Sequence, residues 1–151
     1  MIPPTVHPNT ERQLRRLILA LLTFGLVALC GELVALGHYE DSWQLVPLGL
    51  LSTAVLVIGW HTIGGGAASV LALRVMMVLM VAAGGIGIML HYQGNVAFQL
   101  EVRPDLAGWE LFSKVLHAKA PPALAPGVMA QLGLLGLIYT WRHPAVRGSS
   151  E

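Results

Sequence analysis

The residues best suited to chemistry gather at the end of the first apolar run, in the stretch "CGELVALGHYEDSWQ" over residues 30–44. Glu32 interrupts this run, and His38 and Glu40 lie at its edge. Imidazole and carboxylate groups together suit zinc, copper, iron or manganese. Two residues apart in a helix, His38 and Glu40 would point in different directions, so both could reach one ion only if the helix ends at Gly37.

A second histidine, His91, occupies the matching position in the third apolar run. The first run ends in "LGHYED" and the third in "MLHYQG". If both helices cross a membrane in the same direction, the two imidazoles lie at the same depth. Further polar residues belong to the same edge: Asp41, Asn95, Glu101 and His117. We interpret this edge first as solvated polar residues at the membrane interface. The alternative is a metal site with four candidate ligands: His38, Glu40, His91 and Glu101.

The residues that precede His91 allow a cofactor as a further interpretation. Gly84, Gly87 and His91 follow one another at i, i+3 and i+7, so they share one face of a helix. Small residues let helix backbones approach closely in lipid, but the same smooth face also leaves room for a flat cofactor. His91, with His38 as a second candidate, would then be an axial ligand to haem. No CxxCH motif is present, so this haem would be bound non-covalently.

Glu32 is a candidate for a protonatable group inside a polar pocket. A charged side chain at the centre of a bilayer costs about 2.5–3.5 kcal/mol on insertion scales, so such a group usually faces the bundle interior and meets a partner. The partners we expect are Asn95 and Gln131, together with His91. The sequence leaves open whether this pocket is structural, ligates a metal or relays protons.

The composition shows which elements must position these side chains. Of the 151 residues, 55% are hydrophobic and 11% are charged, and the mean hydropathy is +0.67. Soluble domains carry about 25% charged residues, and here the shortage falls in four stretches that approach the roughly 20 apolar residues of a membrane span. We therefore predict an all-α integral membrane protein with a four-transmembrane-helix bundle. The predicted helices cover residues 14–37, 44–61, 67–92 and 123–141, between tails of residues 1–13 and 142–151.

The basic residues predict how this bundle is oriented in the plasma (inner) membrane, because cytoplasmic loops carry an excess of Lys and Arg. With both tails in the cytoplasm, six arginines lie inside: Arg12, Arg15, Arg16, Arg74, Arg142 and Arg147. Three basic residues then fall outside: Arg103, Lys114 and Lys119. This orientation places His38 and His91 on the outer side.

The predicted external loop, residues 93–122, contains two patterns. Apolar residues alternate over 96–103, which favours a half-buried extended segment, with a continuing helix as the alternative. After Pro104, apolar residues recur at helical spacing over 105–120. This second pattern predicts a short amphipathic helix on the outer face, over the mouth of the bundle or in the headgroups.

Several classes of function find no support in the sequence. The single cysteine, Cys30, excludes an internal disulfide and a CxxC redox or zinc motif. No basic patch with interleaved aromatics favours nucleic-acid binding. No Ser-His-Asp arrangement can be recognised, and catalysis is not the role that we favour.

Three functions remain. The favoured one is a small accessory or structural subunit of a larger membrane complex, with an outward-facing polar pocket and a membrane-protein partner or a second copy of the chain. The alternative is a membrane protein that binds a transition metal or haem through His38, His91 and nearby carboxylates. The third is a component of proton-coupled transport, with Glu32 as the group that takes up the proton.

Overall fold

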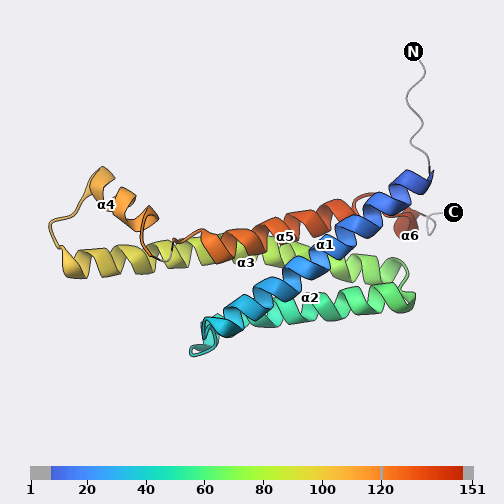
Figure 1. The fold of residues 1–151 in the computed structure, drawn as a ribbon, viewed down its shortest axis with the longest axis horizontal. Coiled ribbons are helices and arrows are strands. Elements are labelled where there is room, and N and C mark those ends of the chain that lie inside the picture. Colours follow the sequence, from blue (N-terminus) through green and yellow to red (C-terminus); the bar gives the residue numbers. More distant parts are fainter. Residues whose placement is uncertain (1–7, 120, 148–151) are drawn as a thin grey trace, which may run out of the picture.

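The computed structural model describes residues 8–119 and 121–147, and this part of the chain is helical and contains no strand. In chain order the elements are α1 (Pro8–Ala35), the short 3-10 helix η1 (Ser42–Gln44), α2 (Leu45–Gly64), α3 (Ala67–Val102), α4 (Gly108–Leu116), α5 (Leu124–Thr140) and α6 (Pro144–Arg147). Figure 1 shows α1, α2, α3 and α5 packed along one another, with α4 set apart at one end. The prediction of an all-helical chain is confirmed.

Three helices are long and apolar enough to cross a membrane, judged by length and composition: α1, η1 together with α2, and α3. The helix α5 is equally apolar in character but has 17 residues. At about 1.5 Å per residue it is about 25 Å long. The chain thus has the composition of a membrane protein.

The end of α1 explains how His38 leaves the helix. Gly37 adopts a left-handed conformation with φ of +69°, which glycine accepts without steric cost. The N–H of Gly37 bonds to the carbonyl of Val34 at 3.0 Å, and the N–H of His38 bonds to that of Leu33 at 2.9 Å. These two bonds form a Schellman motif that stops the helix. The helix therefore ends two residues before the predicted boundary at residue 37.

The helix α3 is the longest element and corrects the predicted loop. Its 36 residues extend from Ala67 to Val102 and correspond to about 54 Å. The predicted end at residue 92 was therefore too early, and the extended segment predicted for 96–103 was wrong. The continuing helix is the alternative that the chain adopts, because local alternation of apolar residues does not by itself break a helix.

Close packing of α3 against α5 depends on glycine. A Cβ on Gly84 would lie 2.6 Å from the Pro126 carbonyl oxygen, and one on Gly133 would lie 2.8 Å from the Met77 carbonyl oxygen. Backbones can approach this closely only where no side chain separates them. The helix-packing interpretation of Gly84 is therefore confirmed.

The four long helices have two distinct ends. At one end, called the arginine end, lie the start of α1, the α2–α3 turn and the end of α5, together with Arg12, Arg15, Arg16, Arg74 and Arg142. At the other, the pocket end, the α1–α2 connection stands apart from α3, and the last part of α3 continues beyond it with α4 (Figure 1). Between the ends, a continuous core joins α1, α2, α3 and α5, and its fully buried side chains include Leu22, Leu26, Leu51, Leu73, Met77 and Met80.

Candidate functional site

A cavity of about 640 Å³ opens at the pocket end, between the α1–η1–α2 segment on one side and α3 with α5 on the other. Its walls are largely aliphatic and include Leu29, Leu33, Ile86, Leu90 and Met129. His38, Asp41, Gln44, His91 and Asn95 supply its polar groups. Cavities of about 300–1,000 Å³ with apolar walls and a few polar groups are typical of small-molecule sites.

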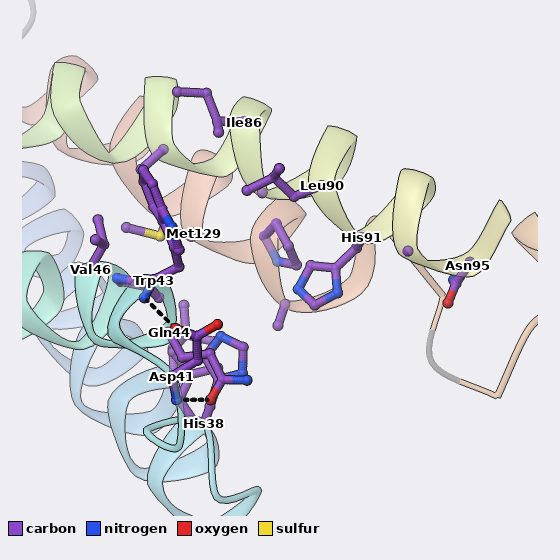
Figure 2. A pocket seen from close by; sticks show the side chains of 18 residues that line it. His38, Asp41, Trp43, Gln44, Val46, Ile86, Leu90, His91, Asn95 and Met129 are labelled. Carbon is purple, nitrogen blue, oxygen red and sulfur yellow. Dashed lines mark hydrogen bonds between the residues drawn. The ribbon is translucent and has the colours of Figure 1, made fainter. Parts of the chain in front are cut away.

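The two predicted histidines meet in this cavity. His38 approaches from the end of α1 and His91 from α3, as Figure 2 shows. Their ring centroids lie 6.2 Å apart, with an angle of 24° between the ring planes. His38 is half-buried and His91 is exposed. Burial, and then the nearby His91, lower the pKa of His38, so the neutral imidazole is favoured near neutral pH.

The loop that carries His38 is held by its own hydrogen bonds. The Gln44 side-chain oxygen accepts from the backbone N–H of Glu40 at 2.9 Å and from that of Asp41 at 3.3 Å. The Asp41 carboxylate accepts from the Ser42 hydroxyl at 3.1 Å and from the Trp43 N–H at 3.4 Å. This capping box fixes the loop between α1 and α2. Asp41 and Gln44 therefore contribute to the shape of the cavity through bonds within the loop.

The other predicted site residues take different positions. Asn95 lines the cavity beside His91. Glu32 and Gln131 are exposed and do not line it; on α1 the cavity contacts Leu29 and Leu33 instead. Glu40 is exposed outside the cavity lining.

Glu101 is also exposed, and it lies ten residues after His91 on the same helix. That separation corresponds to about 15 Å along the axis. The imidazole of His117 bonds to the Ser113 carbonyl at 2.8 Å within its own helix. Neither side chain is among those that line the cavity.

Two of the predicted metal ligands, both imidazoles, line this cavity. Within residues 8–119 and 121–147, no three His, Cys, Asp or Glu side chains are gathered closely enough to hold a metal ion. Of the four candidate metal ligands, the structure thus brings two together, His38 and His91. A pair of imidazoles can serve as the two axial ligands of a haem or hold an ion whose other ligands come from elsewhere.

Beyond the cavity, residues 92–119 form a projecting arm made of the last part of α3, a short loop and α4 (Figure 1). Leu106 and Val115 are buried in it, and α4 packs against α3 and no other helix of the described chain. Trp109 is 78% exposed and Phe98 61% exposed. The amphipathic helix α4 is therefore part of the arm and does not cover the mouth of the bundle.

Arg103, Asp105 and Glu110 form a charged cluster within the arm. Arg103 forms ion pairs with Asp105 at 3.0 Å and with Glu110 at 3.3 Å. The hydrogen bond from Arg103 lowers the pKa of Asp105. The apolar side chains of the arm thus stand beside a cluster in which one guanidinium meets two carboxylates.

A polar network at the arginine end was missed by sequence reasoning. His61 bonds through Nδ1 to the Ser69 hydroxyl and through Nε2 to the Tyr139 hydroxyl, each at 2.8 Å. Arg15 donates to the Tyr139 carbonyl at 2.8 Å, and Arg74 donates to the Thr140 carbonyl at 2.8 Å. These bonds tie α1, α2 and α3 to the end of α5.

The network could have been suspected from two signals. His61 and Ser69 lie on either side of the "GGG" turn, where two antiparallel helices bring their ends together. Lys or Arg side chains also commonly bond to the last carbonyls of a helix. The sequence could not show that arginines from α1 and α3 both reach α5.

Comparison with known proteins finds no matching protein family, no similar curated protein and no similar solved structure.

Proposed function

We propose that the chain is a four-span protein of the plasma membrane, with α5 as the fourth span and the arginine end in the cytoplasm. Arg74 and His91 are separated by 17 residues of α3, or about 25 Å. This length is close to the roughly 30 Å hydrocarbon core of a bilayer. The excess of arginine at one end supports a cytoplasmic position for it, which puts the cavity and the arm outside.

We further propose that the protein is an accessory subunit of a larger membrane complex, and that the arm contacts its partner outside the membrane. The exposed aromatic surface of the arm is the single observation that carries this proposal. Tyr92, Trp109 and Phe112 form a row of ring contacts, with centroids 6.3 Å and 5.3 Å apart. Aromatic residues are enriched at the centres of protein interfaces, and the paired charges of Arg103 argue against an anionic membrane surface as the occupant.

Purification in a mild detergent tests this role. We expect the wild-type chain to elute with a second membrane protein in stoichiometric amount, and Trp109→Ala to elute without it. Phe24→Ala is the matched control, because Phe24 is 72% exposed on α1 away from the arm. A wild-type chain that elutes as a monomer, or equal loss of the partner in both variants, would contradict the proposal. Elution as a homo-oligomer lost in Trp109→Ala would assign the arm to a second copy.

A second candidate function is the binding of a transition metal or non-covalent haem between His38 and His91. The facing rings at 6.2 Å favour it. Each bond from an imidazole nitrogen to a metal takes about 2.0–2.1 Å, and each ring adds the distance from its nitrogen to its centroid. The two rings are therefore close enough for both residues to hold one metal ion or haem iron, which would take an imidazole nitrogen from each.

An absorption spectrum and an elemental analysis of the purified chain test this candidate. We expect a Soret band or one bound metal ion per chain that is lost in His38→Ala and in His91→Ala. His117→Ala should keep it, because His117 lies outside the cavity. A wild-type chain without metal and without a Soret band after growth in iron- and copper-replete medium would exclude both ligands.

Proton-coupled transport through Glu32 stays a prediction without support from contacts. Glu32 is exposed and is separate from the cavity lining. A carboxylate on a path for protons would be expected to face the interior of the bundle.

A further inference from the structure

The guanidinium of Arg74 has more N–H donors than the fold provides with acceptors. Its Nη2 donates to the Thr140 carbonyl at 2.8 Å. None of the ion pairs formed within residues 8–119 and 121–147 includes Arg74. A guanidinium carries five N–H donors, so most of this group is available to an acceptor outside the chain.

The aliphatic part of the Arg74 side chain lines an apolar groove on α3. Arg74, Val75, Val78 and Leu79 line a depression of about 240 Å³ on the surface of α3. Val75 and Val78 are each about half exposed, and they face away from the core. An arginine side chain that begins an apolar groove matches the arrangement of a phospholipid, in which an anionic headgroup continues into an acyl chain.

The level of Arg74 in the bundle agrees with a headgroup. Its acceptor, Thr140, is followed by Trp141, whose indole is exposed, and indole rings favour the membrane–water interface. The valine and leucine of the groove follow Arg74 along α3 towards the centre of the bundle. The guanidinium is therefore at the interface when the groove is in the hydrocarbon.

The charge around Arg74 favours an acid as the ligand. Arg15 and Arg74 both lie near enough to His143 to lower the pKa of that imidazole, after burial and His61. In the described part of the chain, Glu11 is the carboxylate paired with this group of cations, through Arg15 at 3.0 Å. Anionic headgroups are attracted to such clusters of arginine between membrane helices.

We propose that Arg74 and the groove of Val75, Val78 and Leu79 form a binding site for an anionic phospholipid of the leaflet at the arginine end. The guanidinium donates to the lipid phosphate, and the first carbons of an acyl chain lie in the groove. This inference rests on the proposed membrane span of α3. A bound lipid would link α3 to the end of α5, because Arg74 bonds to both the lipid and the Thr140 carbonyl.

Native mass spectrometry of the full chain in delipidated micelles tests the site, with phosphatidylglycerol and phosphatidylcholine as the two probes. We expect the wild type to retain one phosphatidylglycerol in preference to phosphatidylcholine. Val78→Trp fills the groove and leaves the guanidinium and its bond to Thr140 in place. It should weaken binding of phosphatidylglycerol about fivefold or more. Arg74→Gln should remove the preference for the anionic lipid.

Leu56→Trp is the matched control, because Leu56 is 72% exposed on α2 and is not part of the groove. Equal retention of phosphatidylglycerol by wild type, Val78→Trp and Leu56→Trp would overturn the proposal. Displacement of the lipid by millimolar inorganic phosphate would identify a free-anion site instead of a lipid site. Extraction of the membranes with alkaline carbonate tests the proposed membrane spans separately from the lipid site. Release of the chain by carbonate would contradict the proposed membrane spans. A chain that stays in the membrane but retains no lipid would contradict only the lipid site.

Discussion

The two ends of the bundle use polar residues in opposite ways. At the arginine end, His61 hydrogen-bonds to both Ser69 and Tyr139, and two arginines bond to the last carbonyls of α5. At the pocket end, His38 and His91 face each other across 6.2 Å and border a cavity of about 640 Å³. One end is closed by its polar groups, and at the other they line a cavity.

This difference shows that a polar residue in an apolar helix is not by itself evidence for a site. Buried polar groups stabilise a fold when their hydrogen bonds are satisfied within it. Ser69 and Thr140 are fully buried and bonded, so they belong to the structure. No comparable hydrogen bond from His38 or His91 closes the described part of the bundle, which is why we propose the pocket end as the place for a metal or haem.

The largest effect is expected from adding a methyl group to a close helix contact. Gly133→Ala would place its Cβ 2.8 Å from the Met77 carbonyl oxygen, and overpacking of this kind costs about 1–3 kcal/mol. Gly94→Ala, at the cavity, meets nothing within 4 Å and should be neutral or stabilising by up to about 1 kcal/mol. Thermal unfolding in detergent measures both. Equal melting temperatures would mean that the helices are not packed as closely as described.

The second largest effect is a difference in stability between a variant of the arginine end and a variant of the pocket end. Tyr139→Phe removes the hydroxyl that bonds to His61, and loss of such a bond costs about 0.5–1.5 kcal/mol. His91→Gln removes an imidazole that is exposed at the cavity, and we expect stability within about 0.5 kcal/mol of wild type. The same unfolding measurement compares them. If the His91 variant proved the less stable of the two, the proposed division between the ends would be wrong.

The smallest effect is a dependence of stability on pH at the arginine end. Burial, His61, Arg15 and Arg74 lower the pKa of His143, whose ring also contacts Tyr139. The folded state therefore binds fewer protons than the unfolded state, so stability falls as the pH drops below about 6.5. His143→Asn should reduce this slope between pH 7.5 and 5, as measured by melting temperature. An unchanged slope would show that His143 does not contribute.

Much of the fold was predictable because long apolar stretches interrupted by turns and prolines admit few alternatives to helices. The meeting of His38 and His91 was also predictable, since it follows from the direction of two helices. The rotation of α1 about its own axis, which decides the face turned to the core, was not predictable. A helix that is apolar on nearly all sides gives no pattern to distinguish its core face from its lipid face, so Glu32 was placed in the pocket that Leu29 and Leu33 line.

The extent of α3 and the role of the arginines were beyond the sequence for a different reason. The helix continues to Val102, and α4 packs against it. Packing between two helices cannot be read from the local periodicity of either one. In the sequence, Arg15 and Arg74 indicated only the orientation of the bundle in the membrane. Their bonds to the end of α5 depend on how three helices lie against one another.

Cross-linking on intact cells tests most directly whether His38 and His91 share one pocket on the outer side. The variant carries His38→Cys and His91→Cys, with Cys30→Ser to remove the native thiol. We expect a short, membrane-impermeant bis-thiosulfonate reagent, added outside, to join the two cysteines within one chain. A link that forms only after the membrane is permeabilised would contradict the orientation, and a pair that never links in either condition would contradict the shared pocket.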